Sequence, residues 1–361
     1  MTVTDPFARV PGAVVDGRML LHVGSPPREQ RDLAAGRAVA PAASRTVITV
    51  DGPDRLTWLD SITSQAVAGL HPGESSELLV LDPHGHVEHS AGVVDDGART
   101  WLLVDTARAA GLLAWLTRMR FRLRVDPQDG SADYRVIGGT AAAVAALSAD
   151  AVWHDPWPGV GPGGWGYAPT DPHPGAERDW AEAIVDADEY ARVADAAARG
   201  DQAVAGELAA EALRIAAWRP RATHEADDRT LPHEVDWLRT AVHLDKGCYR
   251  GQETVAKVHN LGHPPRRLVA LQLDGSDAVL PEAGADVLYD GDAVGVVTSV
   301  ARHADEGPIA LAIVKRTTPV DAALTVAADG GAVAAAQETI VPPDAGRTAA
   351  VPRLPRLSRR R

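Results

Sequence analysis

The chain has 361 residues, a formal net charge of -13 and a single cysteine, Cys248. This length allows a full hydrophobic core and about two or three domains. One cysteine excludes an intramolecular disulfide and a cysteine-rich metal site within one chain, a pattern common in reducing compartments. Because the sequence has no run of about 18 apolar residues and no signal-like N-terminus, we expect a cytoplasmic protein without a membrane partner.

The acidic balance argues against a surface built to bind nucleic acid, since such surfaces carry excess positive charge. The exception is the stretch RLPRLSRRR at 353–361. Blocks of like charge at chain ends are usually solvated, so we expect a disordered basic tail over 346–361. This tail gives only weak support for RNA, such as transfer RNA, as a partner.

The first part of the chain predicts an α+β fold. RTVITV at 45–50 predicts a strand, and Pro53 with apolar residues at spacings of three or four predicts a helix to about Gly69. A three-stranded meander, a second helix and a further strand are then expected at 77–82, 86–94, 100–105, 112–119 and 121–125. This order favours an α+β arrangement over a doubly wound sheet.

The middle of the chain alternates between irregular and helical composition. Proline and glycine fill 155–178, which predicts a long irregular segment. The segments 181–201 and 202–218 are helical in composition, and we expect Leu208, Leu213 and Ile215 to be core positions.

The last part, from Arg266, consists of short apolar runs separated by turn residues such as those at 290–292 and 329–331. Strands of this length and spacing predict a small antiparallel β-barrel over 266–345. We expect residues 1–265 to form two α+β lobes that are not contiguous in sequence.

The segment HLDKGCYRGQE at 243–253 carries the clearest chemistry. If it is extended, Lys246, Cys248 and Arg250 point to one side, and two cations that flank a thiol favour the reactive thiolate. A lone cysteine can also be a small buried hydrophobic residue. The polar neighbours and glycines around Cys248 argue against that alternative.

The octapeptide KGCYRGQE at 246–253 resembles the signature of the YgfZ-type folate-binding proteins. These proteins are relatives of the glycine-cleavage T-protein, an aminomethyltransferase, and support iron-sulfur enzymes. The resemblance extends over about residues 40–340 and includes GPDRLTWLDSITSQAVAGLHPGE, EALRIAAWRPR, PHEVDWL and PEAGADVLYDGDAVGVVTS. It implies a three-lobed T-protein-like fold with a C-terminal barrel, and tetrahydrofolate or another reduced folate as cofactor.

The chain departs from the T-protein pattern at residues that serve its chemistry. In GHVEHS, His89 and Ser90 stand where the T-protein has an acidic pair, although Glu88 is one residue away. Arg214 matches a T-protein arginine, but Ala216 and Trp218 replace the glutamate and glycine that follow it there. GGWGYAPT at 163–170 also lacks the acidic residue of a T-protein motif. The resemblance therefore implies a folate site whose transferase chemistry is lost or replaced.

These observations give a set of candidate site residues. We expect Cys248 and Lys246 to be catalytic. The candidate folate-binding residues are Arg214, Glu234, Tyr249, Arg250, Gln252 and Glu253. Tryptophans at 153, 157 and 165 could stack on a ring or simply pack in the core. We predict no metal site, because the histidines at 84, 86 and 89 lack a recognised ligand spacing.

Three functions remain open at this level. The first is a folate-binding protein that supports iron-sulfur cluster assembly or repair through Cys248, with iron-sulfur assembly proteins or client enzymes as partners. The second is a folate-dependent one-carbon transferase that acts on protein or transfer RNA. The third is a folate-sensing adaptor without chemistry.

Overall fold

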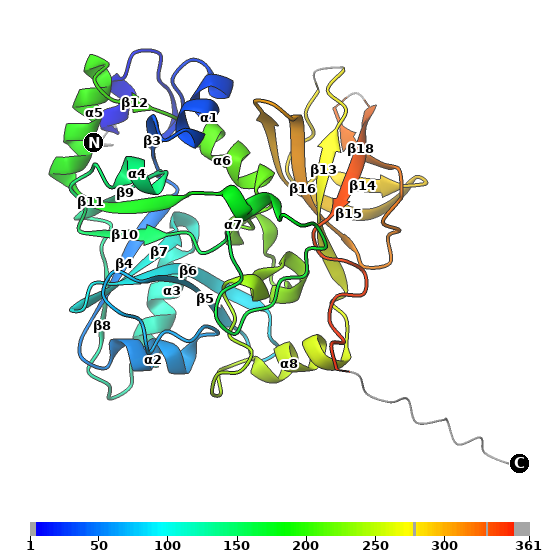
Figure 1. Ribbon diagram of the computed structural model, residues 1–361, viewed down its shortest axis with the longest axis horizontal. Helices are drawn as coiled ribbons and strands as arrows, with labels where there is room; N and C mark the ends of the chain where they lie inside the picture. Colours follow the sequence, from blue (N-terminus) through cyan, green and yellow to red (C-terminus); the bar gives the residue numbers. More distant parts are fainter. Residues whose placement is uncertain (1–4, 277–278, 330, 350–361) are drawn as a thin grey trace, which may run out of the picture.

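The computed structural model describes residues 5–276, 279–329 and 331–349. Figure 1 shows three lobes, two stacked on one side and a barrel on the other, with helices α6 and α7 between them. The basic stretch at 353–361, on which the prediction of a disordered tail rests, lies outside the described residues. Residues 346–349, the last that the structure describes, contact the rest of the chain. The backbone N–H of Thr348 donates to the carbonyl of His259.

The first lobe is one antiparallel sheet with two helices on one face. Its strand order is β5-β6-β7-β4-β8. The bounds are β4 Arg45–Asp51, α2 Arg55–Ile62, β5 Ser75–Leu81, β6 Val87–Asp95, β7 Arg99–Asp105, α3 Thr106–Met119 and β8 Asp126–Asp129. Trp58 of α2 and Trp115 of α3 pack with alternate residues of the strands, so both helices cover the same face. The predicted meander is confirmed.

Two predictions in this lobe are wrong. Helix α2 ends at Ile62 rather than near Gly69, because the chain turns extended at Thr63. The expected strand at 121–125 is a loop, where Phe121 has a positive φ of 45° and is 78% exposed. The strand that pairs with β4 begins only at Asp126.

The second lobe is built around a five-stranded sheet of order β10-β11-β9-β3-β12. Its elements are η1 Pro6–Arg9, β1 Val14–Asp16, β2 Met19–His22, α1 Pro26–Ala34, β3 Ala38–Pro41, β9 Tyr134–Gly139, α4 Ala141–Val144, β10 Ala151–His154, η2 Pro174–Glu177, β11 Ala181–Asp186, α5 Ala187–Arg199 and β12 Ala203–Val204. The sheets of the two lobes pack face to face through residues such as Trp101, Leu103 and Trp153. The helical prediction at 181–201 is wrong for its first six residues, which form β11.

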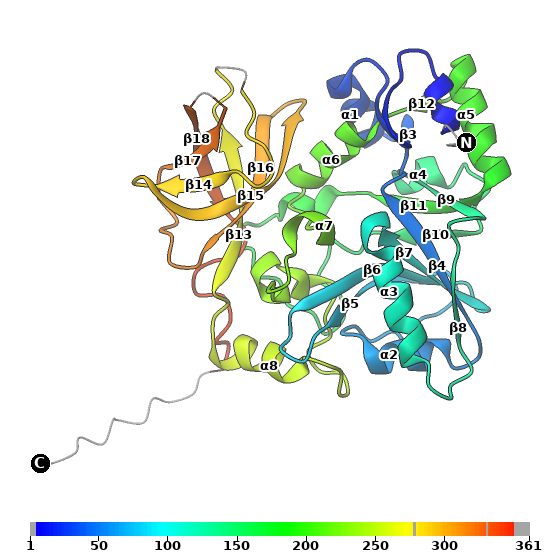
Figure 2. The same ribbon diagram turned by 180° about the vertical axis from the view of Figure 1, so that it is seen from behind.

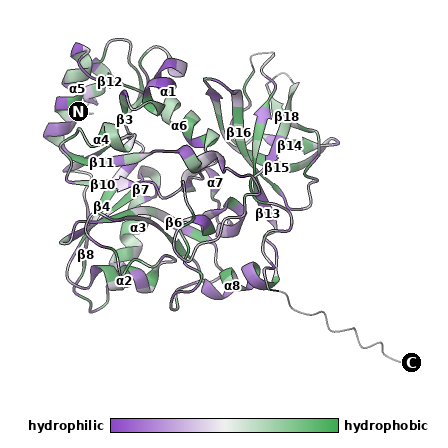
Figure 3. Ribbon diagram, in the orientation of Figure 1, coloured by the Kyte–Doolittle hydropathy of each residue, from purple (hydrophilic) through white to green (hydrophobic). Residues whose placement is uncertain are grey.

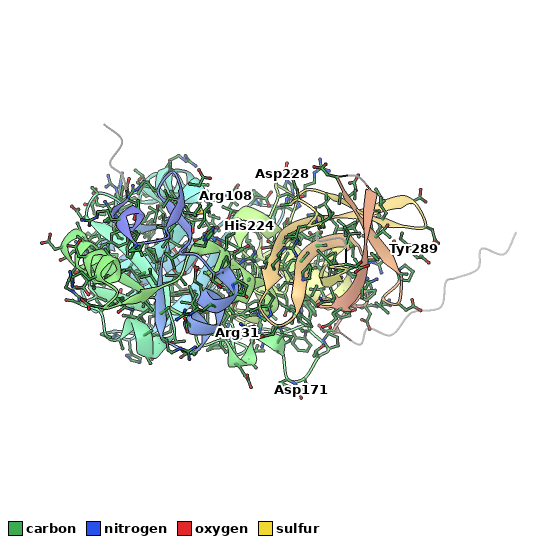
Figure 4. All side chains as sticks on the ribbon, turned by 90° about the horizontal axis from the view of Figure 1, so that it is seen from above. Arg31, Arg108, Asp171, His224, Asp228 and Tyr289 are labelled. Atoms are coloured by element: carbon green, nitrogen blue, oxygen red, sulfur yellow. The ribbon has the colours of Figure 1, made fainter. Side chains whose placement is uncertain are left out.

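The barrel is closed, as predicted, with strand order β13-β16-β15-β14-β17-β18. The strands are β13 Arg266–Leu273, β14 Asp286–Tyr289, β15 Asp292–His303, β16 Gly307–Lys315, β17 Leu324–Ala328 and β18 Gly331–Thr339. In Figure 4, Arg31 of α1 lies where the barrel meets the other lobes, and its guanidinium donates to Asp305 in the turn between β15 and β16.

The connecting segment between the second lobe and the barrel contains α6 Glu207–Ala216, α7 Ala222–Glu225, η3 Pro232–Val235, η4 Trp237–Arg239 and α8 Gln252–Leu261. On α6, Ile215 is 1% exposed as predicted, whereas Leu208 is 46% exposed, so its assignment to the core is wrong. The predicted irregular segment at 155–178 contains only the short η2.

Hydropathy follows this architecture. In Figure 3 the hydrophobic colour follows the strands of the sheets and barrel, and the hydrophilic colour gathers on turns and on α7. Among the described residues, no helix has both the length and the apolar character needed to cross a membrane.

Candidate functional site

A charged cavity lies where the first and second lobes meet the connecting segment. We call it the central cavity. Its lining includes Glu77 and Ser90 from the first lobe, Arg178 from the second and Arg214 and Arg219 from the connecting segment. It leaves about 100 Å³ of free volume. Five arginines and six carboxylates of the described residues contribute to its lining.

One set of ion pairs joins the first lobe to the connecting segment. Arg219 Nη2 donates to Glu77 at 2.8 Å, and Arg219 Nε donates to Asp155 at 3.2 Å. Arg178 Nε also reaches Asp155 at 3.2 Å. Burial by itself raises the pKa of Asp155, but the charges of the two arginines outweigh it and lower the pKa. Asp155 therefore stays ionised inside the protein.

A second set of ion pairs surrounds Arg214 of α6. Its guanidinium donates to Glu211 on the same helix, to Glu225 of α7 at 3.0 Å and to the hydroxyl of Ser299 in the barrel at 2.6 Å. Burial raises the pKa of Glu211, but the charge of Arg214 and its hydrogen bonds bring it down to about 2. The cavity wall thus remains charged over the whole physiological pH range.

Arg45 and Arg221 complete the wall around the start of α3. Both donate to Asp105, at 3.2 Å and 2.8 Å, and Arg45 also donates to Glu182 at 3.0 Å. Each of these arginines has a carboxylate partner, so the ion pairs hold the wall in one arrangement.

Two buried N–H groups of the lining have no acceptor among the described residues. They are Nη1 of Arg219 and Nε1 of Trp237, whose residues are 7% and 1% exposed. A buried donor without a partner costs about 1–3 kcal/mol, so such groups are rarely left unmatched. The central cavity is therefore suited to a ligand that brings oxygen or nitrogen acceptors.

The segment around Cys248 forms a turn rather than the extended strand on which the flanking-cation expectation depended. Cys248 is exposed. The Lys246 ammonium donates to the carbonyls of Asp60, Thr63 and Gln65 at 2.5, 3.1 and 2.7 Å, and so closes the C-terminal end of α2. Burial lowers the pKa of Lys246, with the charge of Asp60 acting in the opposite direction.

Among the other residues of the motif, Arg250 contacts the hairpin between β5 and β6. Arg250 pairs with Glu88 of β6 at 2.8 Å, and Gln252 donates to the carbonyl of Lys246 at 3.1 Å. Glu253 is exposed at the start of α8. Tyr249 is buried, and its hydroxyl has no partner among the described residues.

Glu234 lies elsewhere, on η3, where it contacts Arg266 at the start of β13. It is fully buried, and its Oε2 accepts two hydrogen bonds from Arg266 at 3.0 and 2.8 Å. Burial raises the pKa of this carboxyl, although Arg266 opposes the effect.

Of the eight candidate site residues, the structure brings Arg214 alone to the lining of the central cavity. Lys246, Cys248, Tyr249, Arg250 and Gln252 form a separate group around the motif. The residues that sequence reasoning missed are Arg45, Glu77, Asp155, Arg178, Arg219 and Trp237. Two of them, Arg219 and Trp237, lie in the segments EALRIAAWRPR and PHEVDWL. Because both segments belong to the family resemblance, these two residues could have been identified from the sequence.

The positions that depart from the T-protein pattern divide between two environments. Ser90 lines the central cavity, whereas His89 on the opposite face of β6 packs against Gly111 of α3. Burial lowers the pKa of His89 to about 4, so it is neutral at pH 7. Glu88 does not line the cavity, because it faces Arg250.

The three tryptophans named as candidates for stacking also lie in different environments. Trp153 lines the cavity and donates to the carbonyl of Ser76 at 2.7 Å. Trp157 is fully buried and lies under the guanidinium groups of Arg219 and Arg239. Trp165 is 44% exposed and outside the cavity. Within the described ranges, no three histidine, cysteine or acidic side chains are grouped to hold a metal ion.

Comparison with known proteins places this geometry in a known fold. Residues 266–342 match the family of glycine cleavage T-protein C-terminal barrel domains. The whole chain is similar in structure to the glycine cleavage system aminomethyltransferase T from Bartonella henselae, with a TM-score of 0.70 at 18% identity. The similarity covers 94% of this chain and 97% of that one.

A second similarity is local. The chain is 36% identical over 98 residues to a chloroplastic protein of Arabidopsis thaliana that is named as a candidate transferase. This match covers 26% of this chain and spans about a fifth of the relative's length, 21%. The chain therefore has the T-protein-like fold and carries the T-protein C-terminal barrel.

Proposed function

We propose that this protein binds a reduced folate such as tetrahydrofolate in the central cavity. The observation that carries the proposal is the pair of buried, unmatched donors on Arg219 and Trp237 in the cavity of an aminomethyltransferase-like fold. A pterin ring presents carbonyl and ring-nitrogen acceptors to such donors. The aromatic side chain of Trp153 supplies an apolar surface beside them.

The polar lining fits the pterin, but the free volume of the central cavity limits how much of a folate it can hold. Sites for ligands of this size typically measure about 300–1,000 Å³, and the central cavity offers about 100 Å³. Only part of a folate can lie there without movement of side chains. The remainder of the ligand would lie outside this cavity.

A bound folate would supply a carrier for one-carbon units. The protein's own contribution differs from that of an acidic transferase site, because Ser90 lines the cavity where the acidic pair would be. A serine hydroxyl can donate a hydrogen bond to the ligand, but it is a far weaker base than a carboxylate at pH 7. Binding and orientation of the folate are therefore favoured over aminomethyl transfer.

We assign the chemistry to Cys248, in support of iron-sulfur cluster assembly or repair. The thiol is exposed on a turn that the hairpin between β5 and β6 holds in place, so a partner protein can reach it. One thiolate cannot hold a cluster alone. The iron-sulfur assembly protein or client enzyme must provide the other ligands.

Calorimetry with tetrahydrofolate tests the folate half of the proposal. Trp237→Phe keeps an aromatic ring and removes the unmatched N–H, so we expect roughly fivefold weaker binding for a loss of about 1 kcal/mol. Trp165→Phe is the control, since Trp165 is exposed outside the cavity. Absence of folate binding to the unmodified protein would remove the proposal.

The cysteine half is tested in cells that lack the protein. We expect Cys248→Ala to lower the activity of iron-sulfur enzymes although the purified variant still binds tetrahydrofolate. Full activity with this variant would eliminate a role for the thiol and would favour an adaptor that only senses folate.

A one-carbon transferase is the second candidate, and the name of the plant relative favours it. It requires turnover of methylene-tetrahydrofolate by the purified protein with an aminomethyl donor, a protein or transfer RNA. If the unmodified protein, which has Ser90, shows such turnover, we would conclude that it is a one-carbon transferase and give up the iron-sulfur role.

A further inference from the structure

The second residue of β13, Arg267, is a fully buried arginine. Successive side chains of a strand alternate between its two faces, so Arg267 lies on the same side as Val269, Leu271 and Leu273. Those three side chains belong to the apolar cluster that fills the barrel. Figure 2 shows β13 entering the barrel from the side of α8. The guanidinium of Arg267 is therefore enclosed at the end of the barrel where β13 begins.

The hydrogen-bond partners of this guanidinium are all neutral. Its Nη2 donates to the carbonyl of Thr318 at 2.9 Å and to the side-chain oxygen of Gln337 at 3.0 Å. Its Nε and Nη1 have no acceptor among the described residues, and the hydroxyl of Thr318, a residue that is 4% exposed, has no partner there either. Buried polar groups without a partner are rare in native proteins, and a bound ion or an ordered water commonly accounts for them.

No carboxylate compensates the charge of Arg267 within the part of the chain that the structure describes. Burial lowers the pKa of Arg267, and no acidic group opposes this effect. An arginine side chain nevertheless keeps its proton in proteins, so a full positive charge stays buried. The adjacent Arg266 shows the usual arrangement, because it pairs with Asp227 at 2.6 Å and with Glu234 at 2.8 Å. Arg267 differs from its neighbour in lacking a counter-charge.

The loop between β16 and β17 separates Arg267 from solvent. Thr318 is buried in this loop, whereas the residues at 317 and 319–321 are exposed. The side chain of Gln337 donates to the carbonyls of Pro319 and Ala322 at 2.9 and 3.3 Å, which fastens the loop to β18. Because Thr318 contacts the guanidinium and its neighbours in the chain reach solvent, an ion has to pass only this loop to meet Arg267.

The same loop begins with two further cations. The side chains of Lys315 and Arg316 each donate to a backbone carbonyl, those of Ala293 and Pro343. The one carboxylate of 315–322 is that of Asp321, which is exposed and has no ion pair among the described residues. Although the chain has a net charge of -13, the local charge at this end of the barrel attracts small anions.

We propose that Arg267 and Thr318 bind a compact inorganic anion, chloride, at the end of the barrel. The anion accepts hydrogen bonds from the unmatched N–H groups of the guanidinium and from the Thr318 hydroxyl, and its charge compensates that of Arg267. Water can accept the same hydrogen bonds but leaves the charge uncompensated. Since both residues are enclosed, a monatomic ion fits better than a polyatomic one. Neither residue lines the central cavity, so this inference is independent of the proposed folate function.

Urea unfolding at constant ionic strength, with sodium chloride replacing sodium gluconate, tests the binding. A ligand that binds only the folded chain at one site shifts the folding equilibrium about tenfold for each tenfold rise in its concentration above the dissociation constant. We expect a shift of about tenfold between roughly 50 and 500 mM chloride for the unmodified protein. Arg267→Met should abolish this shift. Lys315→Met is the matched control and should retain it, because Lys315 is an exposed cation of the same loop.

Crystals of the full chain soaked in sodium bromide test the position, since bromide can replace chloride and scatters anomalously. We expect an anomalous peak within hydrogen-bond distance of the Arg267 guanidinium and the Thr318 hydroxyl. If Arg267→Met does not fold, Thr318→Val keeps the charge, removes one donor and should move the chloride response to higher concentration.

Three results would overturn the inference. The first is an equal chloride response in Arg267→Met or Thr318→Val and the unmodified protein. The second is loss of the response in Lys315→Met, which would indicate a diffuse effect of charge. The third is an ordered water beside Arg267 with no bromide peak. Each of these results would leave the proposed folate function standing.

Discussion

Buried carboxylates in this protein differ in whether a cation accompanies them. Asp105, Asp155 and Glu211 each face an arginine and keep a pKa below the ordinary range despite burial. Asp236 is fully buried, and its Oδ1 accepts from the backbone N–H of Tyr167 while its Oδ2 has no partner among the described residues. Burial raises the pKa of Asp236 to about 7, against the weaker opposing effects of that N–H and of Arg239.

This raised pKa predicts a loss of stability as pH rises. A carboxyl pKa near 7 in the folded chain against about 3.9 in the unfolded chain corresponds to ~4 kcal/mol of folding free energy, which is fully present below about pH 4 and is lost progressively as the pH rises from there to 7. Asp236→Asn stays neutral and tolerates the positive φ of 57° at this position. We expect the variant to gain stability relative to the unmodified protein between pH 5.5 and pH 8 in urea unfolding. An identical pH dependence for both proteins would contradict this assignment.

Single residues could be predicted from the sequence only where the local segment determines them. The polar neighbours of Cys248 argued against a buried hydrophobic cysteine, and the residue is exposed. The neighbours could not predict the partners of Lys246, because those carbonyls belong to the end of α2, far away in sequence. The same holds for Glu77 and Asp155, whose importance depends on the distant Arg219.

Among the elements, the turn that carries the motif depends on Gly251. This residue has a φ of +84°, and an added Cβ would lie 2.6 Å from the carbonyl oxygen of Asp82 and 3.0 Å from the Cα of Gly85. The hairpin between β5 and β6 therefore packs directly against the backbone before α8.

Gly251→Ala should accordingly destabilise the protein by about 1–3 kcal/mol, through the unfavourable backbone angle and the collision. Gly247→Ala, in the same motif, is the matched control, since an added Cβ there meets nothing within 4 Å. Denaturant unfolding measures both. Equal effects of the two substitutions would mean that the contact with Asp82 is not a constraint.

Element type was predictable where periodicity was distinct and failed where it was not. The meander and the barrel strands were predicted because turn residues separate short apolar runs. The strand β11, AEAIVD, is buried at five successive positions, and an apolar run of this kind cannot be told from a helical one by periodicity. Its alanines and the helical sequence of α5 that follows produced the wrong prediction.

At the scale of the whole molecule, buried ion pairs connect the lobes. Arg214 joins α6 to α7 through Glu225 and to the barrel through Ser299, and Arg219 joins the connecting segment to Glu77 of the first lobe. Such pairs contribute little net stability when complete, but the loss of one partner leaves a charge buried without compensation.

Arg214→Met should therefore destabilise the fold by about 3–5 kcal/mol. Arg192→Ala provides the contrast, because the Arg192 side chain is 59% exposed in its pair with Glu189 and should cost under about 1 kcal/mol. Thermal unfolding compares the two. Comparable small losses would show that the lobes are held by apolar packing alone.

The overall architecture was predictable from the sequence chiefly through the barrel pattern and the family resemblance. The central cavity was not, because its walls come from the first lobe, the second lobe and the connecting segment, and they become a site only when these parts meet. Arginine and glutamate in EALRIAAWRPR are equally compatible with an exposed helix until the barrel and the first lobe cover them.

The interrupted second lobe affects how the chain can fold as it is made. Strand β3 pairs with β9 and β12, yet the whole first lobe lies between β3 and those partners in sequence. On a ribosome that adds about 5–20 residues per second, the first lobe can fold as soon as β8 emerges. The edges of strand β3 therefore stay unpaired for several seconds. The nascent chain is most prone to incorrect strand pairing just before β9 and β12 complete the sheet of the second lobe.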